Sequence, residues 1–213
     1  MTKHPFILMT GLCLALVVAT FAVGSTLSTP DQISWGAELG PLEDLAAVFF
    51  GLAALCGAAA WVQTRATGWA VYAVLLAAAT MRELDWHSKW TAMSVLKLRF
   101  YSSPGIAWTE KAIGAVIILL LLAAAIYALR RLPDIIRALH AGSWQVTVAV
   151  AAAGFILLSK CIDSLFRLAP GLTAFRPEYG DLLRVAEEAF EAYAGLLFVM
   201  AAVIGTRSGK TKR

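Results

Sequence analysis

A long apolar run ends in the charged stretch RELDWHSK, residues 82–89, and a second apolar run ends in KCIDSLFR, residues 160–167. Each stretch carries a base, an Asp three residues later and another base four residues after the Asp. In each case a Glu opens the next apolar run 25 residues after the Asp, which pairs Asp85 with Glu110 and Asp163 with Glu188. The pattern predicts charged groups at one level of a bundle of membrane-spanning helices.

The composition supports a membrane protein. The 213 residues are 60% hydrophobic and only 15% charged, and the mean hydropathy is +0.73, whereas soluble domains carry about 25% charged residues. The net charge is +4, but the bases form short caps at the ends of apolar runs, so nucleic acid is not an expected partner. The expected partners are membrane lipids, and either a second copy of the chain or another membrane protein.

The apolar residues fall into six runs, at residues 6–27, 45–63, 68–82, 112–129, 144–165 and 189–205. Most runs approach the ~20 residues that a helix needs to cross the hydrocarbon layer, and backbone groups in lipid must be bonded within a helix. The predicted fold is therefore all-α, a polytopic membrane protein formed by a six-transmembrane-helix bundle in one domain, residues 1–213. Short interfacial helices are expected at 86–101 and 132–140, and residues 28–42, with their Pro and Gly, predict a loop.

The matched charges raise the hypothesis that residues 68–130 and 144–205 are duplicated hairpins, with chance similarity at the outer membrane edge as the alternative. With the amino terminus inside, the bases divide nine and nine between the two sides, so the positive-inside rule does not choose an orientation. The basic tail RSGKTKR, residues 207–213, favours the cytoplasm for both termini. The first run is interpreted as an uncleaved helix, with a cleaved signal peptide as the alternative.

Ionisable residues within spans usually face the bundle interior or a wet cavity. Glu83 and His87 lie four residues apart on one face, and Glu187 and Glu191 do likewise. The candidate ligand- or ion-binding residues are Glu83, Asp85, His87, Glu110, Asp163, Glu187, Glu188 and Glu191. The bases expected to balance their charge are Arg82, Lys89, Lys160 and Arg167.

Several chemistries suit such a set. A divalent metal could be held by His87, Glu188 and Glu191, although the neighbouring bases would oppose a cation. Buried carboxylates could instead form a proton or cation pathway, and the bases could bind an anionic lipid headgroup. Lipid hydrolysis would need a nucleophile, and Ser88, Ser94 and Ser159 lack a convincing His partner. The charges could also be ion pairs that only fasten helix ends.

The stretch GPLED, residues 40–44, followed by RELD, residues 82–85, resembles a pattern of uncharacterised bacterial polytopic inner-membrane proteins. The resemblance implies a bacterial inner-membrane location and no particular activity. The first functional hypothesis is transport-like: an outward-facing intramembrane acid and base cluster that handles a proton, a cation or a small charged ligand. The alternatives are a membrane-embedded enzyme, with or without a metal ion, acting on a lipid or polyprenyl-linked substrate, and a non-catalytic membrane assembly subunit.

Overall fold

The structure, a computed structural model, describes residues 4–37, 40–85, 98–168 and 176–210. These ranges contain helices and connecting turns, with no strand. The helices are α1 (His4–Gly24), α2 (Thr29–Trp35), α3 (Pro41–Thr64), α4 (Thr67–Glu83), α6 (Leu98–Ser102), α7 (Trp108–Arg130), α8 (Leu132–His140), α9 (Trp144–Leu168) and α10 (Arg176–Lys210). The all-α prediction is confirmed.

Five of the described helices, α1, α3, α7, α9 and α10, are long and apolar enough to cross a membrane. They are compatible with a multi-pass membrane protein. The third expected span is helix α4, whose 17 residues extend about 26 Å at ~1.5 Å per residue, slightly less than a hydrocarbon layer. A count of six spans therefore stays a prediction.

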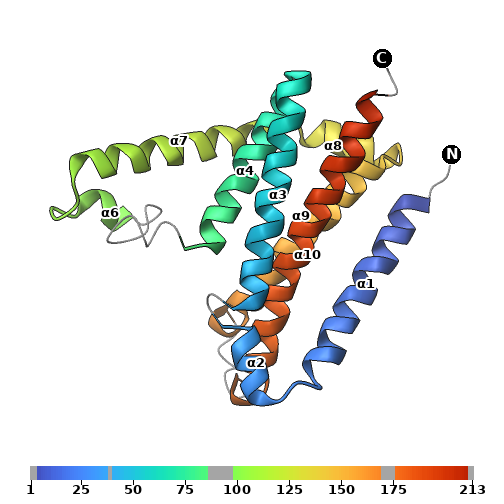
Figure 1. The fold of residues 1–213 in the computed structure, drawn as a ribbon, viewed down its shortest axis with the longest axis vertical. Coiled ribbons are helices and arrows are strands. Elements are labelled where there is room, and N and C mark those ends of the chain that lie inside the picture. Colours follow the sequence, from blue (N-terminus) through green and yellow to red (C-terminus); the bar gives the residue numbers. More distant parts are fainter. Residues whose placement is uncertain (1–3, 38–39, 86–97, 169–175, 211–213) are drawn as a thin grey trace.

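Helix α10 lies at the centre of the fold and packs against both α9 and α3, while α3 forms a hairpin with α4 (Figure 1). Buried aromatic side chains from three helices, Phe50, Phe155 and Phe190, belong to the common core. Small residues allow close approach: a Cβ on Gly195 of α10 would lie 2.8 Å from the Cβ of Phe49 on α3. Such small-residue contacts are typical of helices packed within membranes.

The α3–α4 hairpin turns at Arg65, which adopts a left-handed conformation with φ 57°. Its backbone N–H donates to Trp61 O at 2.7 Å and closes the last turn of α3. The chain leaves α4 through Asp85, which also has a positive φ, of 50°. The hairpin therefore fixes α4 beside α3 and places the last turn of α4 near the middle of the bundle (Figure 1).

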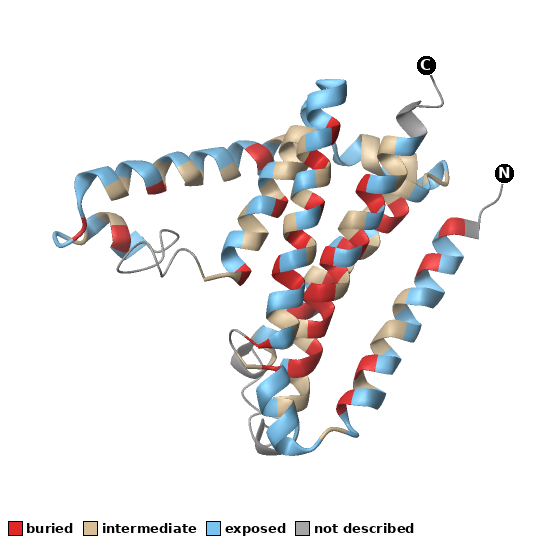
Figure 2. Cartoon of the chain, viewed as in Figure 1, coloured by how far each residue is buried: buried red, intermediate tan, exposed pale blue. Residues whose placement is uncertain are grey.

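Helices α1 and α7 contribute little to the core. Figure 2 shows buried residues concentrated along α3, α9 and α10, whereas α1 and α7 are mostly exposed. Helix α7 runs across the direction of α3 and α10 in Figure 1 instead of alongside them. The large apolar side chains of both helices, for example Leu14 and Leu119, are the surfaces that lipid would cover.

One expectation for the connections is wrong: residues 28–42 are not a continuous loop, because they contain α2. The hydroxyl of Ser28 accepts the backbone N–H of Asp31 and caps this helix, and a proline occupies its first turn. Residues 132–140 do form a helix, α8, and its location in the membrane interface stays a prediction. Of the helix expected at 86–101, the residues before Leu98 lie outside the described part of the chain, and α6 covers its end.

The two ends of the described chain lie at the same end of the fold. The start of α1, the end of α10 and helix α8 are all found there, and α2 lies at the opposite end (Figure 1).

Candidate functional site

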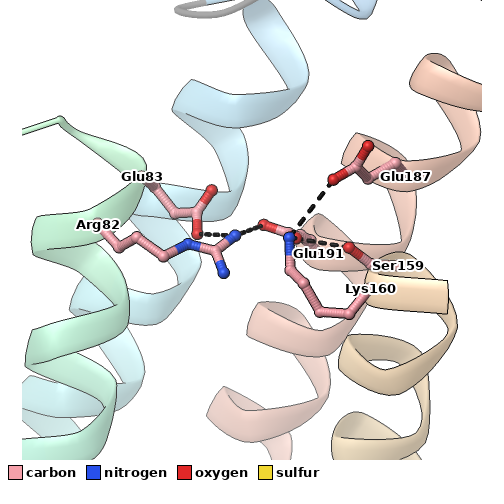
Figure 3. A network of polar contacts seen from close by, with 6 residues as sticks. All are labelled: Arg82, Glu83, Ser159, Lys160, Glu187 and Glu191. Carbon is pink, nitrogen blue, oxygen red and sulfur yellow. Dashed lines mark hydrogen bonds and ion pairs between the residues drawn. The ribbon is translucent and has the colours of Figure 1, made fainter. Parts of the chain in front are cut away.

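Glu191, near the middle of α10, is the centre of a polar network inside the bundle (Figure 3). Its side chain is 2% exposed. Ser159 Oγ donates to Glu191 Oε1 at 2.5 Å, and Lys160 Nζ lies 2.7 Å from the same oxygen. Arg82 Nη2 donates to Glu191 Oε2 at 2.7 Å. Helices α4 and α9 therefore both bind this one carboxylate of α10.

Two further carboxylates share the same bases. Arg82 Nη2 is 3.0 Å from Oε1 of Glu83, whose side chain is 4% exposed. Lys160 Nζ is 3.4 Å from Oε1 of Glu187. Figure 3 shows the guanidinium of Arg82 between Glu83 and Glu191, and the ammonium of Lys160 between Glu187 and Glu191. The two bases join three carboxylates into one network.

The reach of the two basic side chains explains how the network forms. Arg82 sits in the last turn of α4, and its long side chain allows a helix packed on α3 to reach α10. Arg82 and Lys160 are 46% and 38% exposed although their charged ends bind buried carboxylates. Both bases therefore connect the surface of the bundle to its interior, a geometry that long, flexible cationic side chains permit.

Glu188 differs from its neighbours in hydrogen bonding. Its Oε2 is buried and has no hydrogen-bond partner among the described residues. One carboxylate oxygen from each of Glu83, Glu188 and Glu191 lies within 4.8 Å of the others. A buried polar atom without a partner costs free energy unless water or another ligand bonds to it.

These three carboxylates offer the oxygen ligands that a hard divalent cation prefers. The fit is poor, because Arg82 and Lys160 already bind the oxygens of Glu191 and would repel a metal ion. The expected metal candidate His87 lies outside the described residues. The cluster in this arrangement therefore does not fit a metal ion.

The structure brings together six of the residues expected from the sequence: Arg82, Glu83, Lys160, Glu187, Glu188 and Glu191. Asp163 is exposed on α9 at the edge of this network, where its charge acts on Glu187. Glu110 lies in the first turn of α7, a turn that Figure 1 shows far from α9 and α10. Asp85 follows the end of α4. His87 and Lys89 lie outside the described residues, and so does the side chain of Arg167.

Sequence reasoning did not foresee the role of Ser159, which it considered only as a nucleophile. The residue has no exposed surface, and its hydroxyl proton is directed at Glu191. This position does not suit attack on a lipid substrate. Its place beside Lys160 on α9 was the available signal, since a short and a long side chain at adjacent positions can reach the same buried partner.

The arrangement is rich in negative charge. Glu83, Glu187, Glu188 and Glu191 face the two bases Arg82 and Lys160, which gives −4 + 2 = −2 when all are ionised. Such a cluster can accept a proton or attract a cation, while its bases hold the remaining negative charges in place. Compared with known proteins, the chain matches no family model, no curated protein and no solved structure.

Proposed function

We propose that this chain is an integral membrane protein that handles protons at the carboxylate cluster around Glu191. One observation carries the proposal: Glu191 is buried within an apolar helix, is bonded by Arg82 and Lys160 from two other helices, and lies beside two more carboxylates. Ionisable groups at such positions are costly and are commonly retained for ion or proton pathways.

A proton suits this site better than a larger ion. The oxygens of Glu191 already bind Ser159, Lys160 and Arg82, so a metal ion would have to displace cations. A proton needs no coordination shell and can move between a carboxylate and a bonded water. The net formal charge of −2 derived above also favours uptake of a positive charge.

The location and orientation belong to the same proposal. We place the protein in a bacterial inner membrane, supported by the resemblance of its GPLED and RELD stretches. The start of α1 and the end of α10 lie at one end of the fold (Figure 1), and the basic tail favours the cytoplasm for that end. The opposite end, which carries α2, would then face outward.

Proton flux into vesicles tests the proposal. Purified protein is reconstituted into vesicles that contain a pH-sensitive dye, and the outside is acidified while valinomycin and K⁺ collapse the membrane potential. We expect wild-type vesicles to acidify faster than empty ones and Glu188→Gln to abolish the difference. Asp134→Asn, on α8 away from the cluster, should behave as wild type. Equal rates for wild-type and empty vesicles would contradict the proposal.

A second candidate function, a non-catalytic assembly subunit, is favoured by the way the network connects three helices. Arg82 of α4 and Lys160 of α9 both bind Glu191 of α10, an arrangement that would also fasten a scaffold. This function predicts that Glu188→Gln leaves folding unchanged, that Arg82→Gln lowers the melting temperature, and that wild-type protein produces no flux. Copurification of a defined partner would support it further.

A further inference from the structure

A polar pocket lies between α2 and α10, at the end of the fold opposite the termini (Figure 1). Its volume is about 300 Å³, and its lining includes Gln32, Ala37, Asp181 and Arg184. A water molecule needs only about 10–15 Å³ of accessible volume and several polar partners, so this pocket has room for several waters. A second cavity of about 350 Å³, between α1 and α9, has an almost wholly apolar lining and is not expected to hold ordered water.

Close packing of α2 against α10 forms this pocket. A Cβ on Gly36 would lie 3.0 Å from the Cβ of Arg184 and 3.1 Å from Val185 N, so the missing side chain permits the contact. The side-chain amide of Gln32 donates to the carbonyls of Gly24 and Leu27 and holds α2 in place. The pocket is therefore a built feature of the fold.

A stripe of charged residues leads from this pocket to the buried cluster. Asp181, Arg184, Glu188 and Glu191 follow one another at spacings of three, four and three residues, which places them on one face of α10. The stripe is about 15 Å long at ~1.5 Å per residue. Burial increases over its last three residues, from the exposed Arg184 through the partly buried Glu188 to Glu191, which is 1% exposed.

Glu188 occupies the gap between the pocket and the cluster. It lies one helical turn beyond Arg184, and one of its oxygens is within 4.8 Å of oxygens of Glu83 and Glu191. Its buried Oε2 has no partner among the described residues, so a water entering from the pocket would satisfy it. The charged groups around Glu188 are Glu43 on α3, Glu83 on α4 with its partner Arg82, Lys160 on α9, and Glu187 and Glu191 on α10.

From this arrangement we infer that the α2–α10 pocket is the water-filled entrance to the site and that Glu188 is the relay between that water and Glu83, since both oxygens of Glu191 are already bound by Lys160, Ser159 and Arg82. This inference rests on the proposed function for its proton traffic. A hydronium ion in the pocket gives a proton to the Glu188 carboxylate and becomes water. Glu188 then passes the proton to the neighbouring carboxylate of Glu83, one oxygen of which lies within 4.8 Å, and returns to its ionised form.

Thiol labelling tests whether the pocket gives access to residue 188, and it does not require proton flux. Cys13, Cys56 and Cys161 are replaced by Ala, and Glu188→Cys supplies a single thiol. We expect a small hydrophilic methanethiosulfonate to label it, and Ala37→Trp, which fills the pocket, to slow labelling by about ten-fold, because the thiolate that reacts forms in water. Ser34→Trp, on the exposed side of α2, should leave the rate unchanged. Equal labelling rates in the two Trp variants would overturn the inference that the pocket is the entrance.

A second measurement uses the relay residue in its natural form. The variant keeps Glu188 and carries Ala37→Cys as its single thiol. A bulky methanethiosulfonate attached at residue 37 should reduce the proton flux into vesicles by about ten-fold, the factor by which Ala37→Trp is expected to slow the labelling of residue 188. Flux that persists after full modification would overturn the relay route. If labelling depends on residue 37 but unmodified protein carries no flux, the proposed function fails and the hydrated entrance stands.

Discussion

Ser159 donates to Glu191 from a position with no exposed surface. Hydrogen bonds to charged groups contribute about 1.5–3 kcal/mol, and leaving the buried carboxylate short of a donor adds to the loss. We therefore expect Ser159→Ala to lower the free energy of unfolding by about 1–3 kcal/mol, measured by equilibrium denaturation in detergent. Ser34→Ala, at an exposed hydroxyl, should change it by less than about 0.5 kcal/mol. Equal losses would contradict the buried bond.

Asp134 on α8 offers a test of pH dependence outside the membrane spans. Its hydrogen bond from Arg131, 2.8 Å long, and its pairing with Arg137 hold the pKa of this carboxyl below its ordinary value. Because the folded pKa is depressed, the stabilisation is present above the unfolded pKa, about 3.9, and is lost as the pH falls through the folded pKa. We expect Arg131→Gln to raise the Asp134 midpoint in a carboxyl-carbon NMR titration.

The control for Asp134 is Arg130→Gln, which removes the same charge from the adjacent residue, at the end of α7. That variant should move the midpoint less, since the hydrogen bond from Arg131 is the largest cause of the lowered pKa. Equal shifts in both variants would mean that the general field of the bases, and not the bond, sets the pKa.

At the scale of elements, the close contact of α3 with α10 depends on Gly195. An added Cβ would meet Phe49 Cβ at 2.8 Å and the backbone N of Phe50 at 3.3 Å. Overpacking of this kind typically costs about 1–3 kcal/mol, so Gly195→Ala should lower the melting temperature in detergent. Gly154→Ala on α9, where nothing lies within 4 Å, should be neutral or slightly stabilising. A reversed order would show that α3 and α10 are less tightly packed.

The sequence predicted these elements well where apolar runs are long. Helices α3, α7 and α9 follow the second, fourth and fifth runs. The loop predicted at 28–42 from its prolines and glycines is wrong, because Ser28 and Pro30 form the cap and first turn of α2. The paired motifs identified Arg82 and Lys160. They did not show that both bind Glu191, because that contact depends on which faces α4 and α9 turn toward α10. The hairpin duplication stays a prediction.

On the scale of the whole molecule, the chain path bears on the number of membrane crossings. Helix α3 ends at the Arg65 turn, and α9 begins after α8, at the end of the fold that carries both termini (Figure 1). Between these points the chain passes back along α4, beside α3, and then through α7, which runs across the bundle in Figure 1. If all five apolar helices cross, and the start of α1 and the end of α10 lie on one side of the membrane as we propose, the number of crossings is even and α4 is the sixth span.

Single cysteines in the cysteine-free protein test this path in intact cells. We expect an impermeant thiol reagent to label Gly105→Cys, in the exposed turn before α7, and Ala37→Cys, beside the polar pocket. Ala66→Cys, in the exposed α3–α4 turn, should react only after permeabilisation, because α4 would separate it from residue 105. If residues 66 and 105 react from the same side, α4 does not cross the membrane. Arg82 would then reach Glu191 from a helix that stays on one side of the bilayer.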